Sequence, residues 1–275
     1  MFFCYLYTVE IRFRIISGSF FRYYDMKRMR FLTILTALCL SMATASAQTR
    51  TIQHKPYIDL RPMHFGILVG MNLQDIEFEN VGPQTITLDD GTQVQQTIVC
   101  DQDRWNSGFS VGVLADLRLS KHLNLRLTPT MHFGAKHLIF HNLTQLTPEG
   151  LPTEERQDLK NTYISLPLDL KFSAQRWNNY RPYLIAGVNP MLNLSGKDQD
   201  YIRLKRMDTF LEIGMGCDFY LPFFKLIPEL KFCYSLRDAL DHGHADELMD
   251  VNKRLYTNAV STGHSKMIVL TFYFE

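Results

Sequence analysis

The chain has 275 residues, of which 46% are hydrophobic and 12% aromatic, and its formal net charge is +1 at pH 7. This length allows one large domain or two small ones, and a charge so close to zero excludes the basic surface of a typical nucleic-acid-binding protein. The cysteines follow neither a zinc-binding spacing nor a disulfide framework; they are Cys4, Cys39, Cys100, Cys217 and Cys233.

The beginning of the chain has the pattern of a targeting segment. A basic stretch at 27–30 precedes an apolar run at 31–42, and the small residues Ala45 and Ala47 then satisfy the cleavage rule for signal peptides. The apolar run is too short to cross a bilayer about 30 Å thick as a helix. We therefore predict a signal peptide at 26–47.

Two features of this segment leave alternatives open. A signal peptide that begins at Met26 makes residues 1–25 an over-extended start, and the alternative is a genuine N-terminal extension. Cys39 could belong to a lipoprotein signal. Leu38 stands directly before it, where a small residue is expected, which favours ordinary cleavage after Ala47.

Beyond residue 62 the sequence alternates between apolar and polar residues with a period of two, which is typical of β-strands. The alternating segments have about the 9–11 residues that a tilted strand needs to cross a membrane. This part of the chain holds no run of 18 apolar residues, so no transmembrane helix is expected. The segments lie at 64–72, 109–119, 123–133, 162–172, 181–194, 209–221, 224–234 and 266–275.

In most of these segments an apolar stripe lies opposite a stripe that carries charges of both signs. A soluble barrel turns its apolar stripe inward, whereas a membrane barrel turns it toward lipid and keeps charges within. The signal peptide favours the membrane barrel over a soluble lipocalin-like one. The charged residues predicted to face the interior are Asp116, Arg118, Arg126, Asp169, Lys171, Glu212, Asp218, Glu229 and Lys231.

We therefore predict an all-β protein with a transmembrane antiparallel up-and-down β-barrel of about eight strands at 63–275. Residues 48–62 form a periplasmic N-terminal segment before it. An even number of strands places both the N- and the C-terminus in the periplasm, and the barrel is integral to the bacterial outer membrane with lipid around it.

The links between the segments support this orientation, because outer-membrane barrels have short periplasmic turns and longer outer loops. Aromatic residues gather near the short links, where an interfacial girdle is expected; they are Trp177, Tyr180, Tyr183, Tyr220, Phe223 and Phe224. The short links lie at 120–122, 174–180 and 222–223, and the long polar links at about 79–107, 141–161, 195–208 and 236–264.

Candidate chemistry is sparse. The interior charges could form an ion path or a carboxylate pair for acid–base catalysis, but mutual neutralisation inside a narrow barrel is the favoured interpretation. The stretch DHGHAD at 241–246 contains metal-binding residue types, yet it lies in a long link, which favours a solvated loop. His132 and His137 are five residues apart and so fall on opposite faces of an extended chain.

The chain contains neither a nucleophile elbow of the G-x-S-x-G kind nor a phosphate-binding loop. We therefore predict no catalytic, cofactor-binding or metal-binding residues. No cofactor, small-molecule substrate or nucleic-acid partner is expected, and no enzymatic activity. An outer-membrane hydrolase that uses an interior carboxylate such as Glu212 is the enzymatic alternative.

Four blocks of the sequence carry a family resemblance. They are RPMHFG at 61–66, NNYRPY at 178–183, CDFYLPFFKLIPELKF at 217–232 and MIVLTFYFE at 267–275. From about Tyr57 to the end, the chain resembles the PorT family of outer-membrane barrels of Bacteroidetes. The block at 217–232 is the most specific of the four, and the others occur more widely among outer-membrane barrels.

The resemblance implies a part in type IX protein secretion, and in gliding motility where the organism glides. It implies no catalytic residues. An eight-stranded barrel is filled by its own side chains and cannot pass a folded protein, so such a protein is expected to act as an accessory or assembly component beside other secretion-system subunits. Pro222, Phe223 and Phe224 are candidates for a periplasmic contact or, alternatively, for anchoring in the membrane interface. A generic small outer-membrane protein or narrow pore is the alternative function.

Overall fold

The structure is a computed structural model that describes residues 54–275 except 88–92, 103, 149, 196–199 and 249–250. The predicted start segment at 1–25 and signal peptide at 26–47 lie outside the described residues. Among the described residues, no helix is long and apolar enough to pass through a bilayer.

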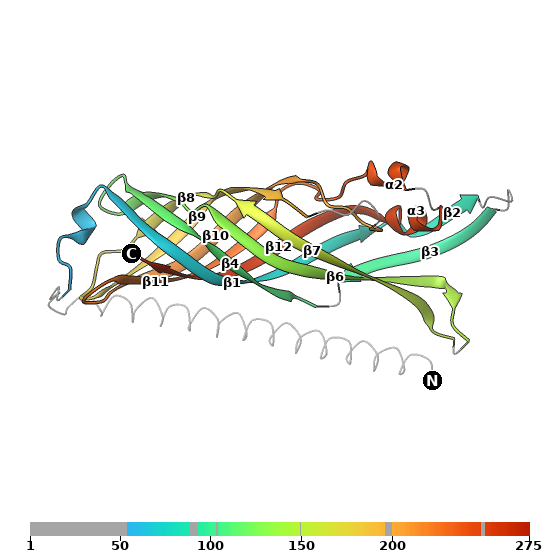
Figure 1. The fold of residues 1–275 in the computed structure, drawn as a ribbon, viewed down its shortest axis with the longest axis horizontal. Helices are drawn as coiled ribbons and strands as arrows, with labels where there is room; N and C mark the ends of the chain where they lie inside the picture. The colour runs from blue at the N-terminus through green and yellow to red at the C-terminus, as the bar shows by residue number, and fades with distance from the viewer. Residues whose placement is uncertain (1–53, 88–92, 103, 149, 196–199, 249–250) are drawn as a thin grey trace, which may run out of the picture. The chain divides into compact units, whose positions relative to one another are not determined.

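The described chain forms one antiparallel sheet that closes on itself, because β10 pairs with β11 on one side and with β9 on the other. The predicted all-β barrel is therefore confirmed (Figure 1). The strands are β1 (Met63–Asn80), β2 (Pro83–Thr87), β3 (Gln93–Gln102), β4 (Asn106–Arg118), β5 (Leu123–Leu127), β6 (Thr130–Leu146), β7 (Pro152–Ser165), β8 (Leu168–Ser173), β9 (Tyr180–Asn193), β10 (Met207–Tyr220), β11 (Lys225–Ser235) and β12 (Val260–Phe274). Three short helices accompany them: η2 (Ile58–Leu60), α2 (His244–Glu247) and α3 (Val251–Thr257).

The sheet has 12 strands within the described ranges, somewhat more than the number of about eight that was predicted. Each of the eight predicted segments falls on this sheet, and two of them are split by a proline. Pro129 separates β5 from β6, and Pro167 separates β7 from β8. Proline has no N–H to donate to a ladder, yet β5 and β6 both pair with β4, and β7 and β8 both pair with β9.

The other additional strands lie in a segment that was predicted to be a long polar link. β2 and β3 form a hairpin that continues the pairing of β1 with β4 without a change in register. Gln74 pairs with Asn106, and nine residues further along each side Pro83 pairs with Thr97. Likewise β6 and β7 continue as a paired hairpin as far as Leu146 and Pro152. The predicted loops at 79–107 and 141–161 are therefore wrong for most of their length. Their β-branched residues, such as Val94, pair across the hairpins instead of forming irregular loops.

The outer face of the barrel wall changes from apolar to charged along its length, and β1 shows the change. Val69 and Leu73 are exposed on the outer face, while Gln74 is fully buried inside. A few residues later the arrangement is reversed, because Ile76 is buried inside and Glu77 is exposed outside. Hydrocarbon favours apolar side chains on the outer face and water favours charged ones, so the membrane boundary crosses β1 near Leu73.

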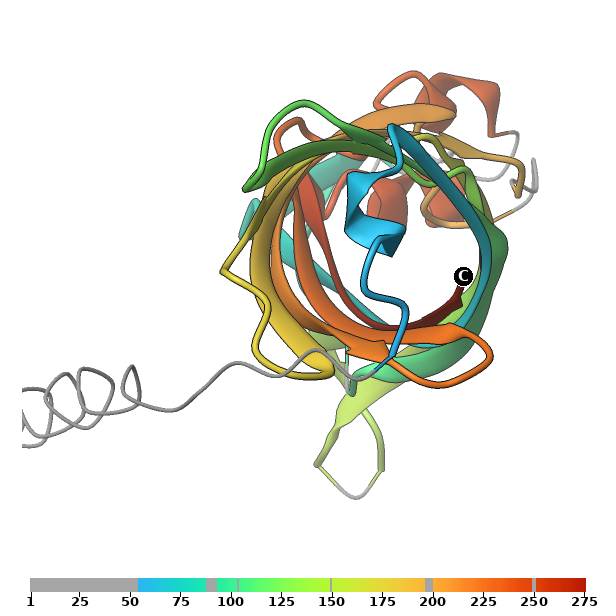
Figure 2. The same ribbon diagram turned by 90° about the vertical axis from the view of Figure 1, so that its left-hand side faces the viewer.

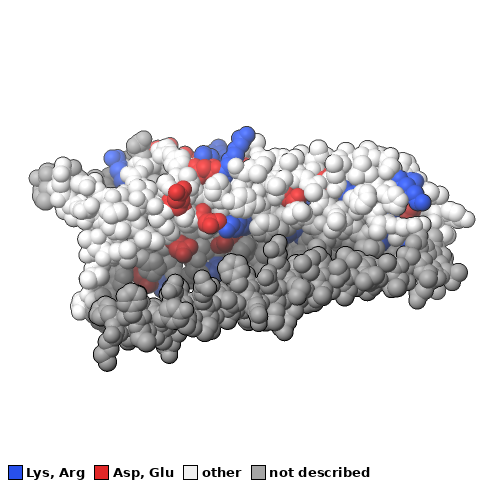
Figure 3. Space-filling model, turned by 180° about the vertical axis from the view of Figure 1, so that it is seen from behind, with Lys and Arg blue, Asp and Glu red and all other residues white. Residues whose placement is uncertain are grey.

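The part of the barrel beyond this boundary, called here the outer part, has a hydrophobic core inside it like that of a soluble protein. Phe140 packs edge-on against Tyr201 and Tyr256 with ring centroids 5.5 Å apart in both cases. Charged side chains on the face seen in Figure 3 gather toward this end. The buried core residues are Ile76, Ile98, Cys100, Leu138, Phe140, Leu159, Ile202, Leu204, Ala239, Leu240, Leu255, Ala259 and Val260.

The reversal of polarity can be tested with two matched substitutions. Ile213 on β10 is 62% exposed on the outer wall in the membrane part, and Leu143 on β6 is 49% exposed in the outer part. We expect Ile213→Arg to lower the free energy of unfolding by about 2–4 kcal/mol and Leu143→Arg by less than about 1 kcal/mol, because the cost of arginine on the wall depends on depth in the bilayer. Denaturant titration in liposomes measures both values, and equal losses would contradict the placement of the boundary.

Candidate functional site

The interior of the membrane part holds a network of ion pairs with Arg126 at its centre. Arg126 on β5 lies directly opposite Asp116 on β4 in the sheet register, and its guanidinium is 3.0 Å from the Asp116 carboxylate. It also reaches across the lumen to Glu229 on β11 at 2.6 Å. Two ionised groups this deeply buried require partners with good geometry. Arg126 supplies them to two strands at once.

Tyrosine hydroxyls complete the coordination of Glu229. Tyr183 and Tyr273 donate hydrogen bonds of 2.5 and 2.6 Å to its two carboxylate oxygens. The guanidinium of Arg126 lies 5.2 Å from the centre of each of these rings. The carboxylate of Glu229 is thereby bound by donors from β5, β9 and β12, and four parts of the wall are held together across the lumen.

Two lysines neutralise the remaining carboxylates at this level. Lys171 donates to Asp218 at 2.8 Å, and Lys231 lies 2.5 Å from Asp169 and 3.1 Å from Glu212. The predicted interior charges are therefore paired inside the barrel, with one exception. The exception is Arg118, which is half-buried at the end of β4 and whose Nε donates to the carbonyl oxygen of Ser120.

Little space remains between these side chains. A cavity of about 20 Å³ lies beside His132, Glu212 and Lys231, which is room for about one water molecule. His132 is buried within the barrel and His137 lies on the outer side, as predicted from their spacing. The interior of the membrane part is therefore filled rather than open.

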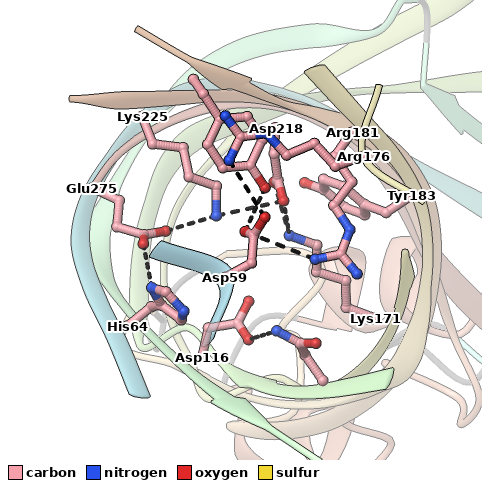
Figure 4. A network of polar contacts seen from close by, with 12 residues as sticks. Asp59, His64, Asp116, Lys171, Arg176, Arg181, Tyr183, Asp218, Lys225 and Glu275 are labelled. Carbon is pink, nitrogen blue, oxygen red and sulfur yellow. Dashed lines mark hydrogen bonds and ion pairs between the residues drawn. The ribbon is translucent and has the colours of Figure 1, made fainter. Parts of the chain in front are cut away.

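A second group of charges lies at the mouth where the short turns are (Figure 4). Lys225 at the start of β11 lies 3.4 Å from Asp218 and 3.0 Å from Glu275, the last residue of the chain. His64 near the start of β1 pairs with the same Glu275. The C-terminal residue is thus joined at this mouth to the starts of β1 and β11 through side chains.

The residues before β1 lie across this mouth. In the end-on view of Figure 2, η2 lies over the opening of the ring of strands, and Figure 1 shows it just beyond the strand ends. Asp59 on η2 accepts a hydrogen bond of 2.6 Å from the Tyr220 hydroxyl, and its carboxylate lies 3.6 Å from Arg176 and 3.8 Å from Arg181. The backbone N–H of His54 donates to the side chain of Asn179 at 3.1 Å. The segment at 54–62, called here the N-terminal plug, therefore covers the lumen.

Sequence reasoning missed this group. Asp59 stands before the first alternating segment, and Arg176 lies in a short turn, so neither has a strand face to indicate its direction. The girdle prediction was wrong for Tyr183 and Tyr220, which are buried inside the barrel. The remaining predicted girdle residues are partly or fully exposed; they are Trp177, Tyr180, Phe223 and Phe224.

At the opposite end, the described parts of the links at 200–206, 236–248 and 253–259 place Ile202, Leu204, Leu240 and Leu255 in the core of the outer part. Arg203 lies 2.9 Å from Asp241 and 2.6 Å from Glu247, and its hydrogen bond lowers the pKa of Glu247. The stretch at 241–246 does not form the solvated loop predicted, because His244 begins α2 and is buried with its Nε2 against the Asp200 carbonyl oxygen. No group of three or more potential metal ligands occurs within the described part of the chain.

The importance of the central pairs can be measured by removing Arg126. Arg126→Gln leaves the buried Asp116 without its cationic partner and leaves Glu229 with only the more distant Lys231, 3.6 Å away. We therefore expect it to lower the free energy of unfolding by about 3–5 kcal/mol. Arg118→Gln removes a half-buried arginine at the end of a strand of the same barrel and serves as the control, with an expected change within about 0.5 kcal/mol. Urea titration in liposomes measures the free energy of unfolding of both variants. A loss for Arg126→Gln as small as that for Arg118→Gln would contradict a stabilising role of the Arg126 ion pairs.

Comparisons with known proteins agree with this architecture. The chain matches a family model described as "Outer membrane protein beta-barrel domain" over residues 46–241. No curated protein sequence matches the chain. Similar solved structures include neisserial surface protein A, which is 11% identical over 78% of this chain and 98% of its own, with a TM-score of 0.38.

Two further solved structures are similar. OprG from Pseudomonas aeruginosa is 14% identical over 82% of this chain and 96% of its own, with a TM-score of 0.42. The outer membrane protease OmpT from Escherichia coli is 11% identical over 82% of this chain and 98% of its own, with a TM-score of 0.35. Since the family model covers more than half of the sequence, the chain belongs to the outer-membrane protein β-barrel domain family and is a protein of the bacterial outer membrane.

Proposed function

We propose that this protein is a non-enzymatic accessory or assembly component of type IX protein secretion, and of gliding motility where the organism glides. The observation that carries the proposal is the filled lumen. The Arg126 network occupies the membrane part, and the N-terminal plug and the outer core cover its two ends. A barrel filled in this way cannot carry a secreted protein, so it acts through its surfaces on other secretion-system subunits.

The choice of the type IX system is supported by the resemblance to the PorT family, above all by the block at 217–232. This block contains the turn between β10 and β11 together with Asp218, Lys225 and Glu229 of the interior network. Phe223, which is 91% exposed, therefore lies in a turn whose two flanking strands carry buried charges of the network. A surface residue held on such a rigid base suits a contact with a partner subunit.

The proposed orientation places the short turns and both chain ends in the periplasm. The charged outer face and hydrophobic core of the outer part support this orientation, because the longer connections of outer-membrane barrels face the outside. The C-terminus lies at the same end as the N-terminal plug (Figure 2). The surfaces available to periplasmic partners are then the plug, the short turns and Phe223.

The non-enzymatic assignment is supported by the state of the interior carboxylates. Glu229 and Asp218 are each held by at least two donors and buried away from solvent. A general base needs access to a substrate proton, and these groups have none. Their arrangement serves the packing of the barrel.

Deletion of the gene tests the secretion role. We expect cargo proteins that bear a type IX sorting domain to disappear from the cell surface and the medium and to accumulate in the periplasm. Immunoblots of fractionated cells measure this, with the wild-type gene supplied in trans as the control. Normal export in the deletion strain would remove the secretion role while leaving the barrel assignment intact.

A generic narrow pore is the alternative function, and planar bilayers distinguish it. The purified mature protein is expected to give no steady conductance, because the lumen is filled by paired side chains. A porin of 16–18 strands with an open channel of known conductance, inserted under the same conditions, is the positive control. Regular channel openings from the wild-type protein would favour the pore over the accessory role.

A further inference from the structure

The mouth under the N-terminal plug contains a preformed binding geometry for a carboxylate. The guanidinium of Arg181 is oriented by the turns of the barrel itself, through hydrogen bonds of 2.8 Å to the Ala174 carbonyl oxygen and 2.6 Å to that of Lys121. Arg176 donates to the Asn178 carbonyl oxygen at 3.0 Å and lies flat on the Tyr220 ring, 3.5 Å from its centre. The Arg181 contacts do not involve the plug. Arg176 also donates to the carbonyl oxygens of His54 and Lys55 in the plug, so its Nη1 and Nη2 become free donors when the plug leaves, while its Nε stays bound to Asn178.

Asp59 fills this geometry only in part. Its distances of 3.6 and 3.8 Å to the two guanidinium groups are longer than the 2.7–2.9 Å of a good charge-assisted hydrogen bond. The short contact is the 2.6 Å hydrogen bond from the Tyr220 hydroxyl. Both arginines are about nine-tenths buried, so a carboxylate that approached more closely would gain two strong hydrogen bonds in a shielded site.

The N-terminal plug is held by little apolar contact. None of the three residues of η2 is buried. Tyr57 is 76% exposed and Leu60 is 62% exposed, so neither packs its apolar side chain into the barrel. Burial of apolar surface is the main stabilising contribution in most packed segments. Polar contacts therefore hold the plug: those of Asp59, the His54 N–H bond to Asn179, and the hydrogen bonds from Arg176 to the His54 and Lys55 carbonyl oxygens. Each of these can be exchanged for a hydrogen bond to water or to another ligand, so the net stabilisation of each is modest.

Displacement of the plug would leave an excess of positive charge at the mouth. Lys171 and Lys225 keep their partner Asp218 in the barrel wall when Asp59 leaves. Arg176 and Arg181 lose the carboxylate that they share. Two partly buried guanidinium groups that converge on one point attract and orient an incoming carboxylate.

We propose that Arg176, Arg181 and Tyr220 form a carboxylate-binding site that Asp59 occupies in this structure, and that receives an acidic side chain of a periplasmic protein when the plug is displaced. The proposal rests on the proposed function in that it assumes a periplasmic partner. The exposed Phe223, in the turn that follows Tyr220, offers apolar surface beside the site that such a protein would cover.

The site can be tested with the purified full-length mature protein in detergent and a fluorescein-labelled tetraglutamate peptide as the probe. Asp59→Asn keeps the size of the side chain but removes the competing charge. We expect this variant to bind the peptide at least tenfold more tightly than the wild type, measured by fluorescence anisotropy at low salt. Adding Arg176→Gln and Arg181→Gln to Asp59→Asn should return the affinity to the wild-type value or below.

A tetraglutamine peptide is the control for the probe, and neither protein should bind it. Arg118→Gln combined with Asp59→Asn is the control for the loss of positive charge and should bind as tightly as Asp59→Asn alone. Circular dichroism and heat-modifiable gel migration show that each variant is folded. Equal binding of the tetraglutamate peptide by the wild type and Asp59→Asn would overturn the proposal, as would full binding by the variant without the two arginines.

The movement of the plug has its own reporter. The chain has two tryptophans, and Trp105→Phe leaves Trp177, which stacks on Tyr180 at the same mouth. Iodide quenching of Trp177 should increase in Asp59→Asn, and unchanged quenching would contradict displacement of the plug.

The binding and quenching measurements do not depend on protein export in the cell. A deletion strain with normal secretion would refute the secretion role alone, and absence of peptide binding would refute this site alone.

Discussion

A residue of a barrel strand can place its side chain only in the lumen or on the outer face of the wall, while the medium outside the wall changes from hydrocarbon to water along the strand. The structure meets this constraint by exchanging the chemistry of its two faces. In β1, Leu73 lies outside and Gln74 inside, and a few residues later Ile76 lies inside and Glu77 outside. The ladder to β12 continues through this point without a shift in register, so the wall stays intact where its polarity reverses.

The same constraint explains how the wall tolerates its prolines. Hydrocarbon offers no hydrogen bonds to a free backbone group, so each interruption of a ladder needs an internal substitute. Near Pro129, the Val113 N–H donates to the proline carbonyl oxygen at 3.0 Å, and near Pro167 the Leu166 N–H donates to Pro190 at 3.1 Å. The strands divide at these positions while the backbone remains paired across the gap.

Much of the membrane part was predictable from sequence, because alternation fixes the side to which a residue points. The buried charges from Asp116 to Lys231 follow from that rule, except Arg118 at the end of a strand. Applied strictly, the rule also places Tyr220 inward, two residues from Asp218. The contacts of Asp59 were not predictable, since turns and tails have no alternating face and the meeting of Asp59 with Arg176 depends on the closure of the whole barrel.

The ion pairs of Arg126 and those of Asp59 differ in the elements of the chain that supply the paired residues. The Arg126 network joins strands, so none of its pairs can open unless the wall itself separates. The carboxylate of Asp59 comes instead from η2, a helix with no fully buried residue. It can leave without breaking any strand pairing. In a barrel whose lumen is filled, a conformational change that does not unfold the wall must occur at its ends, and the short-turn mouth has both a detachable acidic residue and the arginines that would accept another.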